Sequence, residues 1–212
     1  MKSINIITGI VVLSLMAGCK GKGDKSKQER QDKSIEKTEN VTKVAKKEFR
    51  KQLSLQGVTF DVIATDEGSI NQLKIQPSGL SIDNSMVKHE IDGRVIGVEI
   101  EDLDSDGSPE LLIYVTSAGS GSYGSVIGYS VNNMKSMSQI SFPNITDHEK
   151  AGKGYMGHDV FAIVETTFVQ RFPIYKKGDT NSNPTGGTRQ VQYKLTKGEA
   201  CKIFKVSKVL DL

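Results

Sequence analysis

The stretch Leu111-Leu112-Ile113-Tyr114-Val115 consists of five apolar residues, and β-branched and aromatic side chains of this kind are typical of a buried strand. Turn-forming residues bound it, with Asp106-Gly107 before it and the glycine-rich stretch 119–124 after it. Similar short runs recur at 58–62, 72–75, 96–100, 125–131, 161–165, 191–195 and 203–206. Strands at this spacing predict an all-β fold, an antiparallel sandwich or barrel, rather than parallel strands with crossover helices.

A short helix is expected just before these strands. Residues 43–55 carry apolar side chains loosely at helical spacing, namely Val44, Phe49, Leu53 and Leu55. We therefore predict an amphipathic helix over this segment.

The first 18 residues have the composition of a signal peptide. Lys2 precedes the apolar segment 4–16, which is too short to span a membrane. It ends in Leu15-Met16-Ala17-Gly18-Cys19, which resembles a bacterial lipobox, so we expect lipidation of Cys19 with acyl chains and anchoring in a membrane. Lys20 after the cysteine favours an outer-membrane lipoprotein on the periplasmic face. An ordinary secretory signal with an incidental cysteine is the alternative.

Residues 19–47 are predicted to be the lipidated cysteine followed by a disordered charged tether, because almost no apolar residue occurs there. The folded β domain then covers residues 48–212. Of the 28 basic and 25 acidic residues, 11 basic and 5 acidic ones precede residue 48, so 17 basic and 20 acidic residues remain in the domain. This balance gives no electrostatic basis for binding nucleic acid.

Cys201 is the one cysteine left once Cys19 is lipidated, so the domain has no internal disulfide. It lies in the predicted strand 200–204 and is expected to be a buried small hydrophobic residue. Nothing in the sequence indicates a His or Asn partner for a catalytic thiol.

The loop Gly119-Ser120-Gly121-Ser122-Tyr123-Gly124 matches a GxGxxG pattern. A dinucleotide site needs a helix after such a loop, whereas residues 125–131 have the pattern of a strand. The lysine and acidic motifs of protein kinases are missing from the sequence, and no nucleophile elbow can be formed. Glycines in a hairpin permit tight turns that project hydroxyl groups, which suits insertion into another protein's cleft. A plain glycine-rich hairpin with Tyr123 packed on the sheet is the alternative.

The stretch Asp102-Leu103-Asp104-Ser105-Asp106-Gly107 matches the first half of an EF-hand loop, in which Asp102, Asp104 and Asp106 can converge on Ca²⁺. The twelfth position is Ile113 instead of the bidentate Glu, and no helices are expected on either side. We favour an acidic turn in which aspartates cap backbone N–H groups. His148 and His158, ten residues apart, are expected to be solvated surface residues rather than metal ligands.

Three parts of the sequence closely resemble the bacterial periplasmic inhibitors of invertebrate-type (I-type) lysozyme. They are Asp104-Ser105-Asp106-Gly107-Ser108-Pro109-Glu110-Leu111 with the loop 119–124, Arg171-Phe172-Pro173-Ile174-Tyr175 with Pro184-Thr185-Gly186-Gly187-Thr188-Arg189, and Gln192-Tyr193-Lys194-Leu195. The resemblance covers roughly residues 57–210. It implies an antiparallel β-sandwich with a projecting Gly/Ser/Tyr hairpin loop, in which Ser120 and Tyr123 contact the lysozyme active site.

The resemblance implies a lysozyme inhibitor that protects peptidoglycan, with no enzymatic activity and no cofactor, and it suggests a homodimer. The lysozyme-binding residues are predicted to be Ser120, Gly121, Ser122 and Tyr123. The segment 171–189 is either a plain hairpin loop or a second contact region through Arg171, Tyr175 and Arg189. The alternative function is a calcium-binding envelope lipoprotein with a structural or adhesive role.

Overall fold

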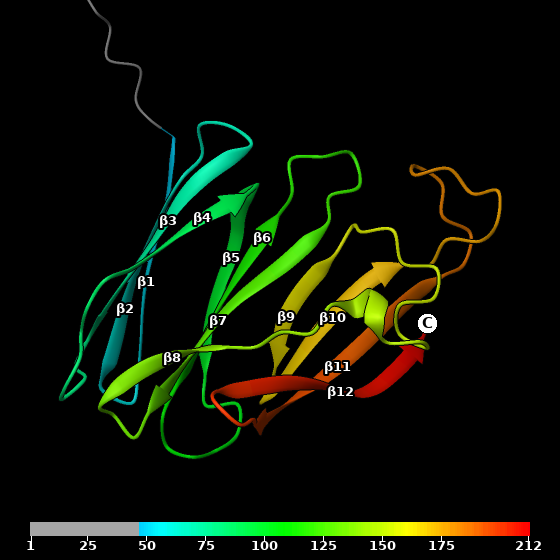
Figure 1. The fold of residues 1–212 in the computed structure, drawn as a ribbon. Helices are drawn as coiled ribbons and strands as arrows, with labels where there is room; N and C mark the ends of the chain where they lie inside the picture. Colours follow the sequence, from blue (N-terminus) through cyan, green and yellow to red (C-terminus); the bar gives the residue numbers. More distant parts are fainter. Residues whose placement is uncertain (1–46) are drawn as a thin grey trace, which may run out of the picture. The chain divides into compact units, whose positions relative to one another are not determined.

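A computed structural model of the protein describes residues 47–212, all within the unit Val44–Leu212. The expected signal peptide, lipidated Cys19 and nearly all of the tether lie outside the described residues. The all-β prediction is confirmed, because residues 47–212 form antiparallel sheets with one short 3₁₀ turn, η1 (Ile145–Asp147) (Figure 1). Within these residues, no helix has the length and hydropathy needed to cross a bilayer.

The strands form three four-stranded sheets. The first contains β1 (Glu48–Leu55), β2 (Val58–Thr65), β3 (Ile70–Ser78) and β4 (Val87–Asp92) in that order. The second contains β5 (Arg94–Glu101), β6 (Glu110–Thr116), β7 (Gly124–Asn132) and β8 (Ser136–Ile140), also in order. The third has the order β12 (Lys202–Asp211), β11 (Thr188–Lys197), β10 (Thr167–Pro173), β9 (Val160–Val164).

In Figure 1 the second sheet lies between the first and the third. A hydrophobic core covers each of its faces, and β6 contributes to both cores. Leu111, Ile113 and Val115 pack in a core shared with the first sheet. Leu112 and Tyr114 point the other way, into an aromatic core shared with the third sheet. Side chains alternate between the faces of a strand, so a continuous apolar run fits a strand that is covered on both sides. The sandwich therefore has three layers and two cores.

The expected helix over residues 43–55 is wrong where the structure describes it. Residues 48–55 form β1, paired with β2 from Glu48↔Thr65 to Leu55↔Val58. Phe49 and Leu53 pack on the core while their neighbours face solvent. The apolar spacing thus fits a period of two better than a period of 3.6.

Cys201 also differs from expectation. It lies one residue before β12, in a bend, and is half-buried instead of buried within a strand.

We expect Leu112→Ala and Ile113→Ala each to lower the free energy of unfolding by about 3 kcal/mol, because each removes a fully buried side chain from one of the two cores. Both should shift one cooperative urea transition, since a single strand supplies both cores. Val164→Ala, at an edge strand with 48% of the side chain exposed, is the matched control and should cost less than about 0.5 kcal/mol. Separate transitions for the two variants would contradict this account of β6.

Candidate functional site

The loop between β6 and β7, residues 117–123, has a defined shape set by its own hydrogen bonds. At its base, the Ser117 N–H donates to the Tyr123 carbonyl at 2.9 Å, and the Tyr123 N–H donates to Ser117 Oγ at 3.0 Å. Inside it, the Ser122 N–H donates to the Gly119 carbonyl at 3.0 Å, with Ser122 at φ 43°. These hydrogen bonds restrict the backbone of the loop, which Gly119 and Gly121 would otherwise make flexible.

The connection between β8 and β9 supports the back of this loop. The His158 N–H donates to the carbonyls of Gly121 at 2.9 Å and Ser122 at 3.2 Å. Gly157 has φ 89°, and a Cβ there would lie 2.1 Å from the Gly121 oxygen. Only glycine fits this close approach. The His158 side chain is half-buried, with its ring stacked on Tyr175, so the expectation of a solvated surface residue is wrong for His158, whereas His148 is exposed.

A polar network ties the end of the loop to the third sheet. Asp159 Oδ2 accepts the Gly124 N–H at 2.6 Å and the Tyr155 hydroxyl at 2.7 Å, while Oδ1 accepts the Gln170 amide at 2.6 Å. The hydroxyl of buried Tyr193 donates to Gln170 Oε1 at 2.6 Å. Burial raises the pKa of the Asp159 carboxyl, and the three donors act against this shift. The network fixes where β7 begins.

The loop between β10 and β11 lies beside the same site. The Asn181 side-chain amide donates to the Ser120 carbonyl at 2.7 Å, and Asn181 Oδ1 lies 3.2 Å from His158 Nε2. In Figure 1, the β6–β7 loop (green) and the β10–β11 loop (orange) project beyond the upper ends of the strands. Segments far apart in sequence thus meet around residues 117–123.

The side chains predicted to bind a partner remain available. Ser120 is exposed, and Tyr123 is 48% exposed with its ring edge-on to Tyr155 at 5.8 Å between centroids. Within residues 47–212, the hydroxyls of Ser120 and Tyr123 have no hydrogen-bond partner. Gly121 and Ser122 are half-buried, so they determine the shape of the loop and expose less surface to a partner than Ser120 and Tyr123 do.

The three residues predicted for a second contact region have different environments. Arg171 is exposed on β10, with Nε donating to Gln190 at 2.6 Å. Tyr175 is 7% exposed, and its hydroxyl donates to the Asn181 carbonyl at 2.8 Å. Arg189 is 5% exposed and donates two bonds to Asp211, at 2.7 and 2.9 Å. Tyr175 and Arg189 thus serve inside the fold, and the exposed part of this region is the loop between them.

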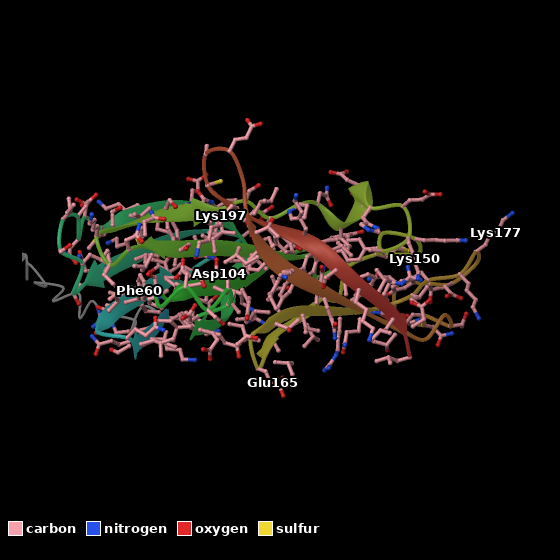
Figure 2. The ribbon with its side chains drawn as sticks, turned by 90° about the horizontal axis from the view of Figure 1, so that it is seen from below. Phe60, Asp104, Lys150, Glu165, Lys177 and Lys197 are labelled. Carbon is pink, nitrogen blue, oxygen red and sulfur yellow. The ribbon has the colours of Figure 1, made fainter. Side chains whose placement is uncertain are left out.

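Arg189 also joins two loops at this end of the unit. Its Nη1 donates to the carbonyls of Lys150, Ala151 and Lys153, at 2.9, 3.3 and 2.6 Å. Figure 2 shows Lys150 and Lys177, one from each loop, at the same end of the molecule.

The sequence was compared with known protein families. Residues 80–163 match the family model of periplasmic lysozyme inhibitors of I-type lysozyme. The match runs from β4 to β9 and includes the whole 117–123 loop, so the resemblance seen in the sequence is confirmed over these residues. It supports a role as a lysozyme inhibitor of the cell envelope. No curated protein and no solved structure matches the chain.

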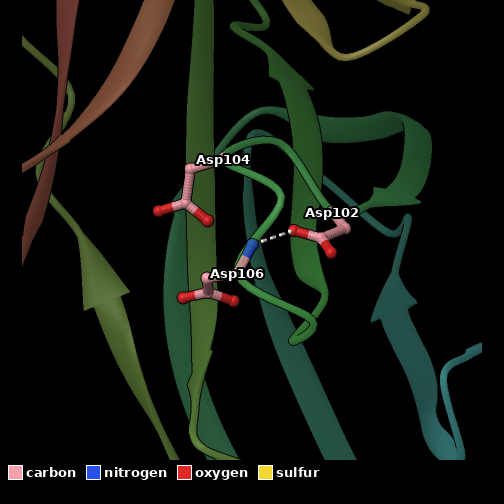
Figure 3. A group of neighbouring side chains, drawn as sticks. All are labelled: Asp102, Asp104 and Asp106. Atoms are coloured by element: carbon pink, nitrogen blue, oxygen red, sulfur yellow. Dashed lines mark hydrogen bonds between the residues drawn. The ribbon is translucent and has the colours of Figure 1, made fainter.

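The acidic turn lies at the other end of β6 from the 117–123 loop. Carboxylate oxygens of Asp102, Asp104 and Asp106 lie within 4.8 Å of one another (Figure 3). Asp102 accepts the backbone N–H groups of Asp106 at 3.0 Å and Gly107 at 2.9 Å, and Asp106 accepts that of Ser108 at 2.9 Å. These bonds are those of the expected acidic turn.

Lys202 supplies a cation to this turn. Its ammonium lies 2.8 Å from both Asp104 and Asp106 and 3.0 Å from Glu110, which is fully buried. Burial alone would lower the pKa of Lys202, but hydrogen bonds to the three carboxylates outweigh it and raise the pKa. Burial raises the pKa of Glu110, although Ser130, the Leu103 N–H and Lys202 all donate to it. A metal ion held by Asp102, Asp104 and Asp106 would compete with this ammonium for two of the three carboxylates.

Replacing Lys202 by Met should lower the free energy of unfolding by about 3 kcal/mol at pH 7, because it leaves the buried Glu110 carboxylate without its counter-charge. Adding Glu110→Gln should restore part of the loss, whereas Lys205→Met, an exposed lysine of β12, should change little. Urea unfolding measures all three.

The loss should also depend on pH. When the pKa of a carboxyl is higher in the folded than in the unfolded protein, the free energy of unfolding falls as pH rises from the unfolded-state pKa to the folded-state pKa. Lys202 lowers the pKa of Glu110 against the effect of burial, so Lys202→Met raises this pKa further, and the deficit of the variant should grow from about pH 4 to pH 7. A deficit independent of pH would contradict the role given to Lys202.

Proposed function

We propose that this protein inhibits an I-type lysozyme by inserting the side chains of Ser120 and Tyr123, from the 117–123 loop, into the active-site cleft. The observation that carries the proposal is a contrast within the loop. Its backbone is held by neighbouring segments, while the Ser120 and Tyr123 hydroxyls have no partner among the described residues. The family match over residues 80–163, which include this loop, supports the target.

Inhibition of this kind needs no chemistry from the inhibitor. A glycosidase cleft contains two carboxyl groups around the scissile bond, one of which donates a proton. Hydroxyl groups can donate to those carboxylates while the loop fills the space of the sugar substrate. A hydrogen bond to a charged group contributes roughly 1.5–3 kcal/mol, and a loop that is already ordered loses little entropy on binding.

The amino-terminal sequence supports a place for this activity in the envelope. A lipid on Cys19 and the charged residues 20–47 would hold the domain at the periplasmic face of the outer membrane. A lysozyme entering the periplasm would meet the inhibitor beside the peptidoglycan that it attacks.

Ser120→Ala and Tyr123→Phe should each weaken lysozyme binding by about tenfold, because each removes one hydroxyl that bonds to a charged group in the cleft. The melting temperature should be almost unchanged, since neither hydroxyl is bonded within residues 47–212. The double variant should lose most inhibition in a cell-wall turbidity assay. Ser105→Ala, an exposed serine in the acidic turn, is the matched control.

Normal binding by both single variants would place the inhibitory surface elsewhere, first in the β10–β11 loop. Tests with invertebrate-, chicken- and goose-type lysozymes would show which class is the target.

Cys19→Ala should move the protein from the membrane fraction to the soluble fraction, because it removes the thiol that takes the lipid. Inhibition should persist in the soluble form, since the residues assigned to contact all lie beyond residue 116. Membrane association that survives the substitution would overturn the anchoring proposal, and loss of inhibition would show that the anchor itself contributes to binding.

A further inference from the structure

We propose that Asn181, in the β10–β11 loop, is a positioning residue that holds the inhibitory loop in its binding conformation. The inference rests on the proposed function and adds a determinant of affinity outside residues 80–163, where the family match lies. Asn181 is 61 residues from Ser120 in sequence, yet its side-chain amide donates a hydrogen bond to the Ser120 backbone carbonyl.

The Asn181 amide joins two segments at once. Its nitrogen donates to the Ser120 carbonyl at 2.7 Å, so its oxygen faces His158 Nε2 at 3.2 Å and accepts from it. His158 in turn donates its backbone N–H to Gly121 and Ser122. Asn181 and His158 thus hold three consecutive peptide units of the loop, those carrying the carbonyls of residues 120–122.

The bond to Ser120 acts where the loop has most freedom. Ser120 lies between Gly119 and Gly121, and glycine restricts the backbone less than any other residue. Within residues 47–212, the Asn181 amide is the hydrogen-bond partner of the Ser120 carbonyl. Removing this donor frees the peptide plane next to the hydroxyl that is proposed to enter the cleft.

Asn181 is itself fixed, which a positioning residue requires. Its carbonyl accepts the hydroxyl of Tyr175, a buried residue whose ring stacks with His158 at 6.4 Å between centroids. Two residues before Asn181, Asp179 accepts the backbone N–H groups of Lys176 at 2.7 Å and Thr185 at 2.8 Å, and so joins the two halves of the loop. These bonds lower the pKa of the Asp179 carboxyl.

The test uses the full-length protein with Asn181→Ala, Asn181→Asp and the control Asn183→Ala. Asn183 is an exposed amide of the same loop, and among the described residues its side chain has no hydrogen-bond partner. Asn181→Ala should weaken lysozyme binding about five- to tenfold through the cost of ordering a freed loop. Asn181→Asp keeps the size of the side chain but has no donor at neutral pH, so it should lose as much.

A second readout separates positioning from general stability. Amide hydrogen exchange at Ser122 and Tyr123, whose N–H groups are bonded inside the loop, should become faster in Asn181→Ala, while the melting temperature stays close to that of the unaltered protein. Asn183→Ala should change neither binding nor exchange.

The outcomes distinguish this inference from the proposed function. Failure of the unaltered protein to bind any lysozyme overturns the proposed function, and with it the effect on affinity. Binding by the unaltered protein and Asn181→Ala with equal affinity overturns the positioning role alone. Unchanged exchange at Ser122 and Tyr123 also overturns it, whatever the binding result.

Discussion

Burial of β6 on both faces is the constraint on which the rest of this domain depends. Leu111, Ile113 and Val115 complete one core, and Leu112 and Tyr114 complete the other. A strand held from both sides has fixed ends, because moving it by one residue would exchange the side chains of the two cores. The acidic turn lies at one end of β6 and the 117–123 loop at the other. The loop therefore starts from the most restrained strand of the sheet.

The 117–123 loop combines a restrained backbone with side-chain hydroxyls that have no partner within residues 47–212. Its carbonyl and N–H groups are bonded to His158, Asn181, Asp159 and to one another. The Ser120 and Tyr123 hydroxyls have no hydrogen-bond partner among residues 47–212. A loop that is already ordered loses less entropy when it binds, so its contacts contribute more to affinity.

Much of the fold could be predicted from the sequence, because the buried strands are continuous or alternating apolar runs. The strands β4, β8 and β10 were missed, and β1 was mistaken for a helix. These strands carry many polar or charged residues, as in Ser136–Ile140, so their pairing depends on neighbours that the local pattern does not show.

The candidate loop was found from its glycines, serines and tyrosine, but its supports were not. Asp159 and Asn181 act on the loop across 35 and 61 residues, and a single sequence carries no signal for such contacts. Tyr175 and Arg189 are in or beside a polar, glycine-rich segment, which made them candidates for contact. The structure shows that both side chains are buried in the fold.

Steady-state kinetics of an I-type lysozyme at several concentrations of this protein test the central claim most directly. A loop that occupies the cleft excludes substrate, so we expect competitive inhibition. The apparent KM should rise linearly with the concentration of this protein, and kcat should stay unchanged. A fall in kcat at constant KM would show binding away from the cleft and contradict the account.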